Sequence, residues 1–267
     1  ARHPQPTVKA QALTHLIFQR PDLKEAARFL TDFGLTVSRQ DADTLYLRAT
    51  EPTSYCYRIH LAEQARFIGF GLAVQSREDL EKLTRIPGAS PVAKSDHPGG
   101  GYCVSLTDPS GFTVEAVCDQ TPGKTLAHRA PLAWNLAHEQ PRINATQRPP
   151  IAPPEVLRLG HIVIEVADYQ ATCAWYTQHF GFIPSDVQVL PDGTPIVAFM
   201  RLDFLQAHDV RLDALQPAEQ PLAASRTDSV GIECDDPEHA TRRPQKGGEL
   251  CNLSETVAAE SRRNCKG

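Results

Sequence analysis

The hydrophobic positions of the chain switch between a strand period and a helix period, and the switches mark repeated units. Residues 13–19 read as a strand, and a helix follows that begins after Asp22, a plausible N-cap, and ends at Gly34. Three more strands are expected near residues 36–40, 45–48 and 55–61. Residues 13–62 therefore predict a βαβββ unit. The helix is expected to bury the stripe formed by Ala26, Phe29, Leu30 and Phe33.

Two further units follow. The second is expected to contain the strand 67–74, the helix 77–83 and the strands 102–106 and 112–117. The third runs from Leu157 to about Asp203, with a helix from Tyr169 to Phe180 and a hairpin turn at residues 190–194. Its helix is expected to bury Cys173, Tyr176 and Phe180, and Trp175 and Tyr176 are interpreted as core residues.

The units predict two halves and a connection between them. We expect an N-terminal domain at residues 10–120, a Pro-rich linker at 121–155 and a C-terminal domain at 156–267. The pattern fades within the last of these, because residues 205–267 contain no aromatic side chain and few branched aliphatics. Residues 204–267 are therefore expected to be atypical and to pack poorly. Residues 229–236 resemble the start of a degenerate fourth unit, and a shifted reading frame after Asp203 is one hypothesis for the change.

Composition narrows the class of protein. The 267 residues are enough for two domains, each with its own hydrophobic core. The net charge of −5 gives no excess of positive charge for binding nucleic acid. No apolar run approaches the length of a membrane span. Seven cysteines without clustered spacing argue against a disulfide framework or a zinc knot. These features favour a cytoplasmic protein with reduced thiols.

One histidine opens the first strand of the third unit, and another opens that of the first unit. They are His161 and His15. A strand holds a side chain in a fixed direction, which suits a metal ligand. The competing interpretation is a histidine that hydrogen-bonds to the backbone. Gly99-Gly100-Gly101 is interpreted as a turn rather than a phosphate loop, because no Lys-Ser/Thr follows it.

These motifs resemble the vicinal oxygen chelate superfamily, and within it the type I extradiol dioxygenases of the catechol and dihydroxybiphenyl kind. The matching segments are Gly160–Asp168, Trp175-Tyr176, Phe180-Gly-Phe182, Ser185-Asp186, and Asp108-Pro-Ser-Gly111 with Glu115. The resemblance covers roughly residues 10–203. It implies an α+β fold of paired βαβββ modules, the glyoxalase, bleomycin resistance and extradiol dioxygenase fold.

The resemblance also implies an activity and a cofactor. Enzymes of this kind cleave a catecholic ring with O2, using Fe(II) held by two histidines and one carboxylate, with Mn(II) or another divalent metal as the alternative. The first ligand corresponds to His161. The histidine that lies beside the metal ligands and transfers protons corresponds to His208. The implied partners are a small aromatic diol and dioxygen, without nucleic acid or membrane, and relatives often assemble into homo-oligomers.

The sequence departs from the family where the remaining ligands are expected. No histidine lies near Ser229, and no closing strand with a carboxylate is recognisable after it. Because the sequence provides one of the three expected metal ligands, we expect a weakly active or inactive chain. Two alternatives stay open. One is a glyoxalase-like lyase or isomerase with a divalent metal in the first half, where His15, His60 and Glu115 fall at ligand positions and the fourth position, Ile68, is apolar. The other is a metal-free binding protein of bleomycin-resistance type.

Overall fold

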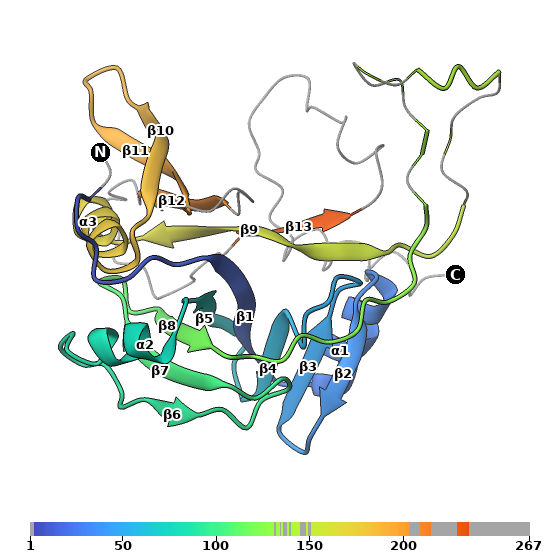
Figure 1. The fold of residues 1–267 in the computed structure, drawn as a ribbon, viewed down its shortest axis with the longest axis horizontal. Coiled ribbons are helices and arrows are strands. Elements are labelled where there is room, and N and C mark those ends of the chain that lie inside the picture. The colour runs from blue at the N-terminus through green and yellow to red at the C-terminus, as the bar shows by residue number, and fades with distance from the viewer. Residues whose placement is uncertain are drawn as a thin grey trace.

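The described part of the chain forms two β-sheets with a shared core (Figure 1). The computed structural model describes residues 3–130, 132–133, 135, 138, 140–144, 148 and 151–202, together with the strand backbones at 209–214 and 229–234. No helix of this described part is long and apolar enough to cross a membrane.

The first sheet has eight strands and is built from two βαβββ units. The first unit contains β1 (Ala12–Arg20), α1 (Leu23–Asp32), β2 (Thr36–Gln40), β3 (Thr44–Arg48) and β4 (Tyr57–Leu61). The second unit contains β5 (Arg66–Ala73), α2 (Arg77–Leu83), β6 (Ala93–Lys94), β7 (Tyr102–Thr107) and β8 (Thr113–Cys118). The strand order is β2-β3-β4-β1-β5-β8-β7-β6, and β1 and β5 pair antiparallel at the centre. Each unit thus contributes its first strand to the joint between them.

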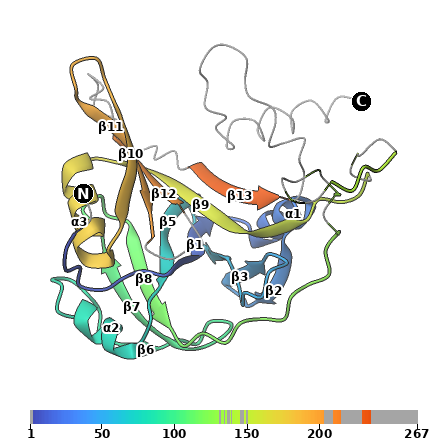
Figure 2. The ribbon, with the colours of Figure 1, turned by 45° about the horizontal axis from the view of Figure 1, so that its top comes forward.

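The second sheet repeats the first unit and adds one strand. Its elements are β9 (Val156–Val166), α3 (Tyr169–Phe180), β10 (Ile183–Val189), β11 (Pro195–Arg201), β12 (Asp209–Ala214) and β13 (Ser229–Cys234). The order β10-β11-β12-β9-β13 matches β2-β3-β4-β1-β5 of the first sheet. The hairpin of β10 and β11 rises away from the first sheet (Figure 2). The strand β13 pairs antiparallel with β9, as β5 does with β1, and so begins a fourth unit.

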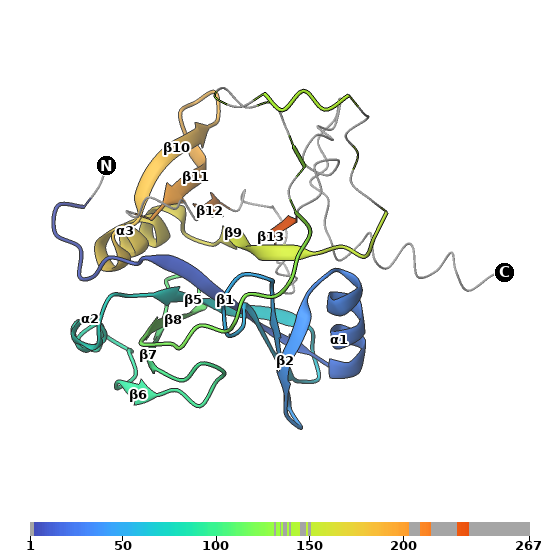
Figure 3. The same cartoon turned by 45° about the vertical axis from the view of Figure 1, so that its right-hand side comes forward.

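The two sheets share a continuous hydrophobic core. Strand β9 runs beside β1, and Ile162, Ile164 and Val166 of β9 are fully buried (Figure 3). Helix α3 packs Tyr176 against Phe70 of β5, with ring centroids 6.0 Å apart. The burial of these aromatic and aliphatic side chains by both sheets favours one folding unit over two independent ones.

Polar contacts also join the halves. The Tyr176 hydroxyl donates to Oδ2 of Asp108, at 2.8 Å, while the other oxygen of this carboxylate accepts from the backbone N–H groups of Ser110 and Phe112. Burial raises the pKa of Asp108. The segment before β1 donates backbone hydrogen bonds to the last carbonyls of α3, from Thr7, Val8 and Ala10. These bonds satisfy helix-end carbonyls that would otherwise lack partners.

The local predictions are largely confirmed, with three corrections. Asp22 caps α1 by accepting from the N–H groups of Lys24 and Glu25, and α2 and α3 have the predicted bounds. However, Phe29 is 40% exposed and stacks on Phe33 rather than entering the core, which Leu23 and Leu30 enter instead. Cys173 is only half-buried. The third unit ends at Ala214 rather than Asp203, because Asp209–Ala214 forms β12, whose alternating positions Val210, Leu212 and Ala214 are not part of a strand predicted from the sequence.

Candidate functional site

His161 lies on β9, and its side chain is exposed. The flanking residues Gly160 and Ile162 are buried, and Ile164 follows on the buried face. His161 therefore projects from the opposite face, away from the shared core. Across the sheet it pairs with Gly231 of β13. The exposed His161 imidazole could therefore reach a metal ion. The residue opposite it on β13 is a glycine, so β13 provides no second imidazole at this position.

The described residues do not complete an iron site around His161. An Fe(II) oxygenase site takes two histidines and a carboxylate, and here β9 contributes one histidine opposite a glycine. Within the described part of the chain, no three His, Cys, Asp or Glu side chains are arranged to hold a metal. His208, the predicted acid/base, lies outside the described residues.

The first half does bring chemistry-bearing side chains together. His15 of β1 is fully buried, and its Nε2 lies 3.1 Å from Oε2 of Glu115 on β8. The register explains the meeting, because His15 pairs with Gly71 of β5 and Gly71 pairs with Glu115. The three residues form a row across the sheet. A Cβ on Gly71 would lie 2.1 Å from Cε1 of His15, so only glycine leaves room for this imidazole.

An arginine of β4 binds the other oxygen of the carboxylate. Nη2 of Arg58 lies 2.5 Å from Oε1 of Glu115, and Nη1 lies 2.5 Å from Nε2 of His97. His97 comes from the loop before β7, and its Nδ1 is 2.9 Å from the Tyr46 hydroxyl. The Arg58 and Glu115 side chains are only 5% and 13% exposed. We call His15, Tyr46, Arg58, His97 and Glu115 the arginine cluster.

The donors of the arginine cluster fix the protonation of its histidines. A guanidinium only donates, so Nε2 of His97 accepts and Nδ1 carries the proton toward Tyr46. Nε2 of His15 faces the Glu115 carboxylate, so the proton of this imidazole is on Nε2. The unprotonated Nδ1 then accepts a hydrogen bond from the Thr14 hydroxyl at 2.9 Å. Both imidazoles are neutral in this arrangement.

The pKa shifts agree with this assignment. Burial lowers the pKa of His15, and burial together with the Arg58 charge lowers that of His97 to about 4. Burial alone would raise the pKa of Glu115, but the hydrogen bonds and charges of His15 and Arg58 outweigh it and hold this pKa well below its usual range. The Glu115 charge likewise outweighs burial and raises the pKa of Arg58. The cluster is thus one buried ion pair flanked by two neutral imidazoles.

The predicted first-half ligands are only partly brought together. His15 and Glu115 form a hydrogen bond. His60 instead has its Nδ1 3.4 Å from the Thr44 hydroxyl. His97 lies in the loop before β7 and belongs to the cluster through Tyr46 and Arg58. Neither Arg58 nor His97 stands out in the sequence. The only signal is the alternation Tyr57-Arg58-Ile59-His60, which places Arg58 on the same face as His60.

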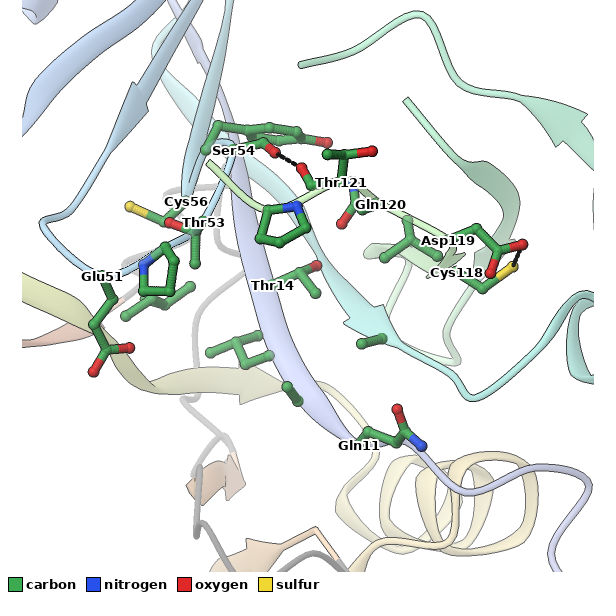
Figure 4. A pocket seen from close by; sticks show the side chains of 18 of the residues that line it. Gln11, Thr14, Glu51, Thr53, Ser54, Cys56, Cys118, Asp119, Gln120 and Thr121 are labelled. Atoms are coloured by element: carbon green, nitrogen blue, oxygen red, sulfur yellow. Dashed lines mark hydrogen bonds between the residues drawn. The ribbon is translucent and has the colours of Figure 1, made fainter. Parts of the chain in front are cut away.

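A cavity of about 410 Å³ lies next to the arginine cluster. Its lining comes from the start of β1, the ends of β5 and β8, the loop before β4, and Arg158 and Leu159 of β9 (Figure 4). Tyr55 lines it, and the Tyr55 ring centroid lies 4.8 Å from that of His15. The hydroxyls of Thr53 and Tyr55 are buried without a hydrogen-bond partner of normal geometry. The cavity has the size of a small-molecule site and lies where both halves contribute to its wall.

Comparison with known proteins supports the fold. Residues 158–249 match the model of the Glyoxalase/Bleomycin resistance protein/Dioxygenase superfamily. No curated protein matches the sequence. The match continues past Asp203, so the superfamily sequence does not stop where the hydrophobic pattern fades.

Solved structures give the same result. The Mn(II)-bound glyoxalase from Novosphingobium aromaticivorans superposes with a TM-score of 0.60 at 20% identity, over 78% of this chain and 62% of its own. Homoprotocatechuate 2,3-dioxygenase from Arthrobacter globiformis has a TM-score of 0.61 at 19% identity, over 79% and 62%. The enzyme from Brevibacterium fuscum in complex with 3,4-dihydroxyphenylacetate has a TM-score of 0.61 at 18% identity, over 80% and 63%.

These matches confirm the predicted α+β fold of paired βαβββ modules and the resemblance to the vicinal oxygen chelate superfamily. The chain spans less than two thirds of the length of each of the three structures. At this level of identity the likeness concerns the fold, and the activity is argued from the site.

Proposed function

Because this chain has the fold of the vicinal oxygen chelate superfamily and a segment that matches the superfamily model, we propose that it descends from extradiol dioxygenases that cleave catecholic rings with Fe(II) and O2. The supporting observation is His161. It is an exposed imidazole on β9, the strand of the second sheet that corresponds to β1 of the first. In this proposal His161 is the first metal ligand and His208 the proton-transferring histidine.

The described residues argue for weak metal binding by the second half. The register partner of His161 is Gly231, and a single imidazole holds Fe(II) poorly. We therefore expect the chain to bind iron at low occupancy and to turn over small aromatic diols slowly or not at all.

A direct test combines metal content with ring cleavage. The full chain is loaded anaerobically with Fe(II), and the iron bound per chain is measured for the wild type, His161→Ala and the exposed-loop control His128→Ala. Catechol and 3,4-dihydroxyphenylacetate are then added with O2, and the yellow ring-cleavage product is followed by absorbance. We expect low iron occupancy that decreases in His161→Ala and is unchanged in His128→Ala.

Two results would contradict the proposal. Iron bound equally by the wild type and His161→Ala would remove His161 from the site. A metal-dependent lyase or isomerase activity that needs no oxygen would favour the second candidate, a glyoxalase-like enzyme. That candidate is favoured by the likeness to the Mn(II)-bound glyoxalase and by the contact of His15 with Glu115 in the first half.

A further inference from the structure

A chain of hydrogen bonds connects the buried ion pair of the first half to the wall of the cavity. Arg58 donates to Glu115, and the other oxygen of this carboxylate accepts from Nε2 of His15. Nδ1 of His15 accepts in turn from the Thr14 hydroxyl. Thr14 is only half-buried and lines the cavity (Figure 4). The last member of the chain is therefore in reach of a ligand.

The direction of these hydrogen bonds determines what the Thr14 hydroxyl can offer. The proton of the His15 imidazole is on Nε2, facing the carboxylate, so Nδ1 needs a donor. The Thr14 hydroxyl donates its one proton to Nδ1, and its oxygen keeps a lone pair. A ligand group that binds this oxygen from the cavity must therefore be a hydrogen-bond donor.

Much of the remaining wall is apolar. Its apolar and aromatic side chains come from strands and loops of both halves, and they are Leu13, Pro52, Tyr55, Val74, Val117, Pro122 and Leu159. Tyr55 also packs against the arginine cluster, since its ring centroid lies 4.8 Å from that of His15. An aromatic ligand suits a wall of this kind, because a flat ring buries a large apolar area and packs favourably on other rings.

The charges of the wall disfavour an anionic ligand. Glu51 and Asp119 are exposed residues on opposite sides of the cavity (Figure 4). Among the described lining residues, Arg158 is the one cationic side chain, so the carboxylates are in excess. A negatively charged molecule would be repelled on entry, because like charges raise the cost of binding.

We propose that this cavity binds a small uncharged phenol, whose hydroxyl donates to Oγ1 of Thr14 and whose ring contacts the apolar part of the wall. The volume of about 410 Å³ is in the range of small-molecule sites. His161 is not among the lining residues, so this site is separate from the one proposed for iron. Because both halves contribute to the wall, a bound phenol contacts both of them.

Three probes of similar shape test the class of ligand. The full chain is treated with a chelator, and the dissociation constants of 4-methylphenol, toluene and benzoate are measured by saturation-transfer NMR. Toluene lacks the donor, and benzoate adds a negative charge. We expect 4-methylphenol to bind about three- to tenfold more tightly than toluene, the factor that one hydrogen bond supplies, and benzoate to bind most weakly.

Variants test the position of the site. Thr14→Val removes the acceptor and should weaken 4-methylphenol binding about three- to tenfold while leaving toluene binding unchanged. The matched control is Thr7→Val, because the Thr7 hydroxyl also contacts an imidazole, that of His179, but does not line the cavity. Ala12→Phe adds a large side chain to a lining position and should weaken both probes. His161→Ala should bind both probes as the wild type does.

Several results would overturn the proposal. They are equal affinities of the wild type for 4-methylphenol and toluene, tighter binding of benzoate, and equal weakening in Thr14→Val and Thr7→Val. Loss of 4-methylphenol binding in His161→Ala would place the phenol in the second half and would also contradict the proposal. If Thr14→Val does not fold, the affinity ratio of the probes in the wild type and their binding to Ala12→Phe give the decision.

Discussion

His15 on β1 and His161 on β9 occupy equivalent strands, and each pairs with a glycine on the antiparallel neighbour, Gly71 or Gly231. Their surroundings differ. His15 is buried and bonds Glu115 of β8, whereas His161 is exposed. In the first half, the strand beyond the glycine provides the partner, because β8 contributes the Glu115 carboxylate to the row containing His15. Beyond β13 the described part of the chain contains no further strand of the second sheet. In the first half, the histidine at the start of one unit thus gains its charged partner from the closing strand of the other unit.

The largest expected effect is on the buried ion pair of the first half. Glu115→Ala leaves the Arg58 guanidinium buried without its carboxylate, which should cost about 3–5 kcal/mol of unfolding free energy. Urea denaturation measures the loss. The matched control is Glu165→Ala on β9, a half-buried carboxylate of the second sheet, and it should cost less. Equal losses at the two positions would mean that the first half has no special electrostatic requirement.

The next largest expected difference is between the stability losses of alanine variants at His15 and His161. His15→Ala removes a buried, hydrogen-bonded imidazole, and we expect a loss of about 1–3 kcal/mol. His161→Ala changes an exposed side chain, and we expect a change within about 0.5 kcal/mol. The same denaturation curves report both values. A large loss from His161→Ala would indicate that this histidine is a structural residue rather than one kept for binding.

The decrease in unfolding free energy at acidic pH should come mainly from the buried histidines of the first half. The folded pKa of His97, about 4, lies below its unfolded value, so between these values the unfolded chain binds more protons. Stability is therefore full above about pH 6.5 and is lost as the pH falls toward 4, with a slope of up to about 1.4 kcal/mol per pH unit from this group.

His15 acts in the same direction, because burial lowers its pKa too. In His97→Gln the slope between pH 6.5 and 4 should decrease, whereas in the control His128→Gln it should not. Unfolding midpoints measured across this range check the prediction. An unchanged slope in His97→Gln would show that His97 is not held neutral in the folded chain.

The smallest of the four effects concerns the joint between the halves. Tyr176→Phe removes the hydroxyl that donates to Asp108 and should cost about 1 kcal/mol. Tyr169→Phe, on the same helix but only half-buried, should cost less. Thermal unfolding should also stay a single transition in both variants. A separate transition for the second half in Tyr176→Phe would show that this hydrogen bond is required for joint unfolding.

The sequence predicts the units but not the arginine cluster, for a physical reason. Strand and helix periods are local, so the bounds of α2 and α3 and the cap at Asp22 can be derived from a few neighbouring residues. The cluster depends on the register of four strands and on the position of one loop. This register brings together residues as far apart in the sequence as His15 and Glu115. The resemblance points to His15 and Glu115 as ligand positions, but nothing local marks Arg58 as their partner.

The exposure of Phe29 illustrates the limit of the helix pattern. Phe29 lies on the apolar side of α1 in sequence, yet the core beneath the helix is filled by Leu23 and Leu30. The pattern identifies an amphipathic helix, while the sheet determines how wide a stripe is covered.

The segment before β1 lies against the end of α3, although more than 160 positions separate them in the chain. A protease that nicked the Pro-rich connection would therefore release no fragment under native conditions. The two pieces would stay associated through the backbone bonds of Thr7, Val8 and Ala10 and through the packing of Tyr176 on Phe70. Only denaturant would reveal the cut.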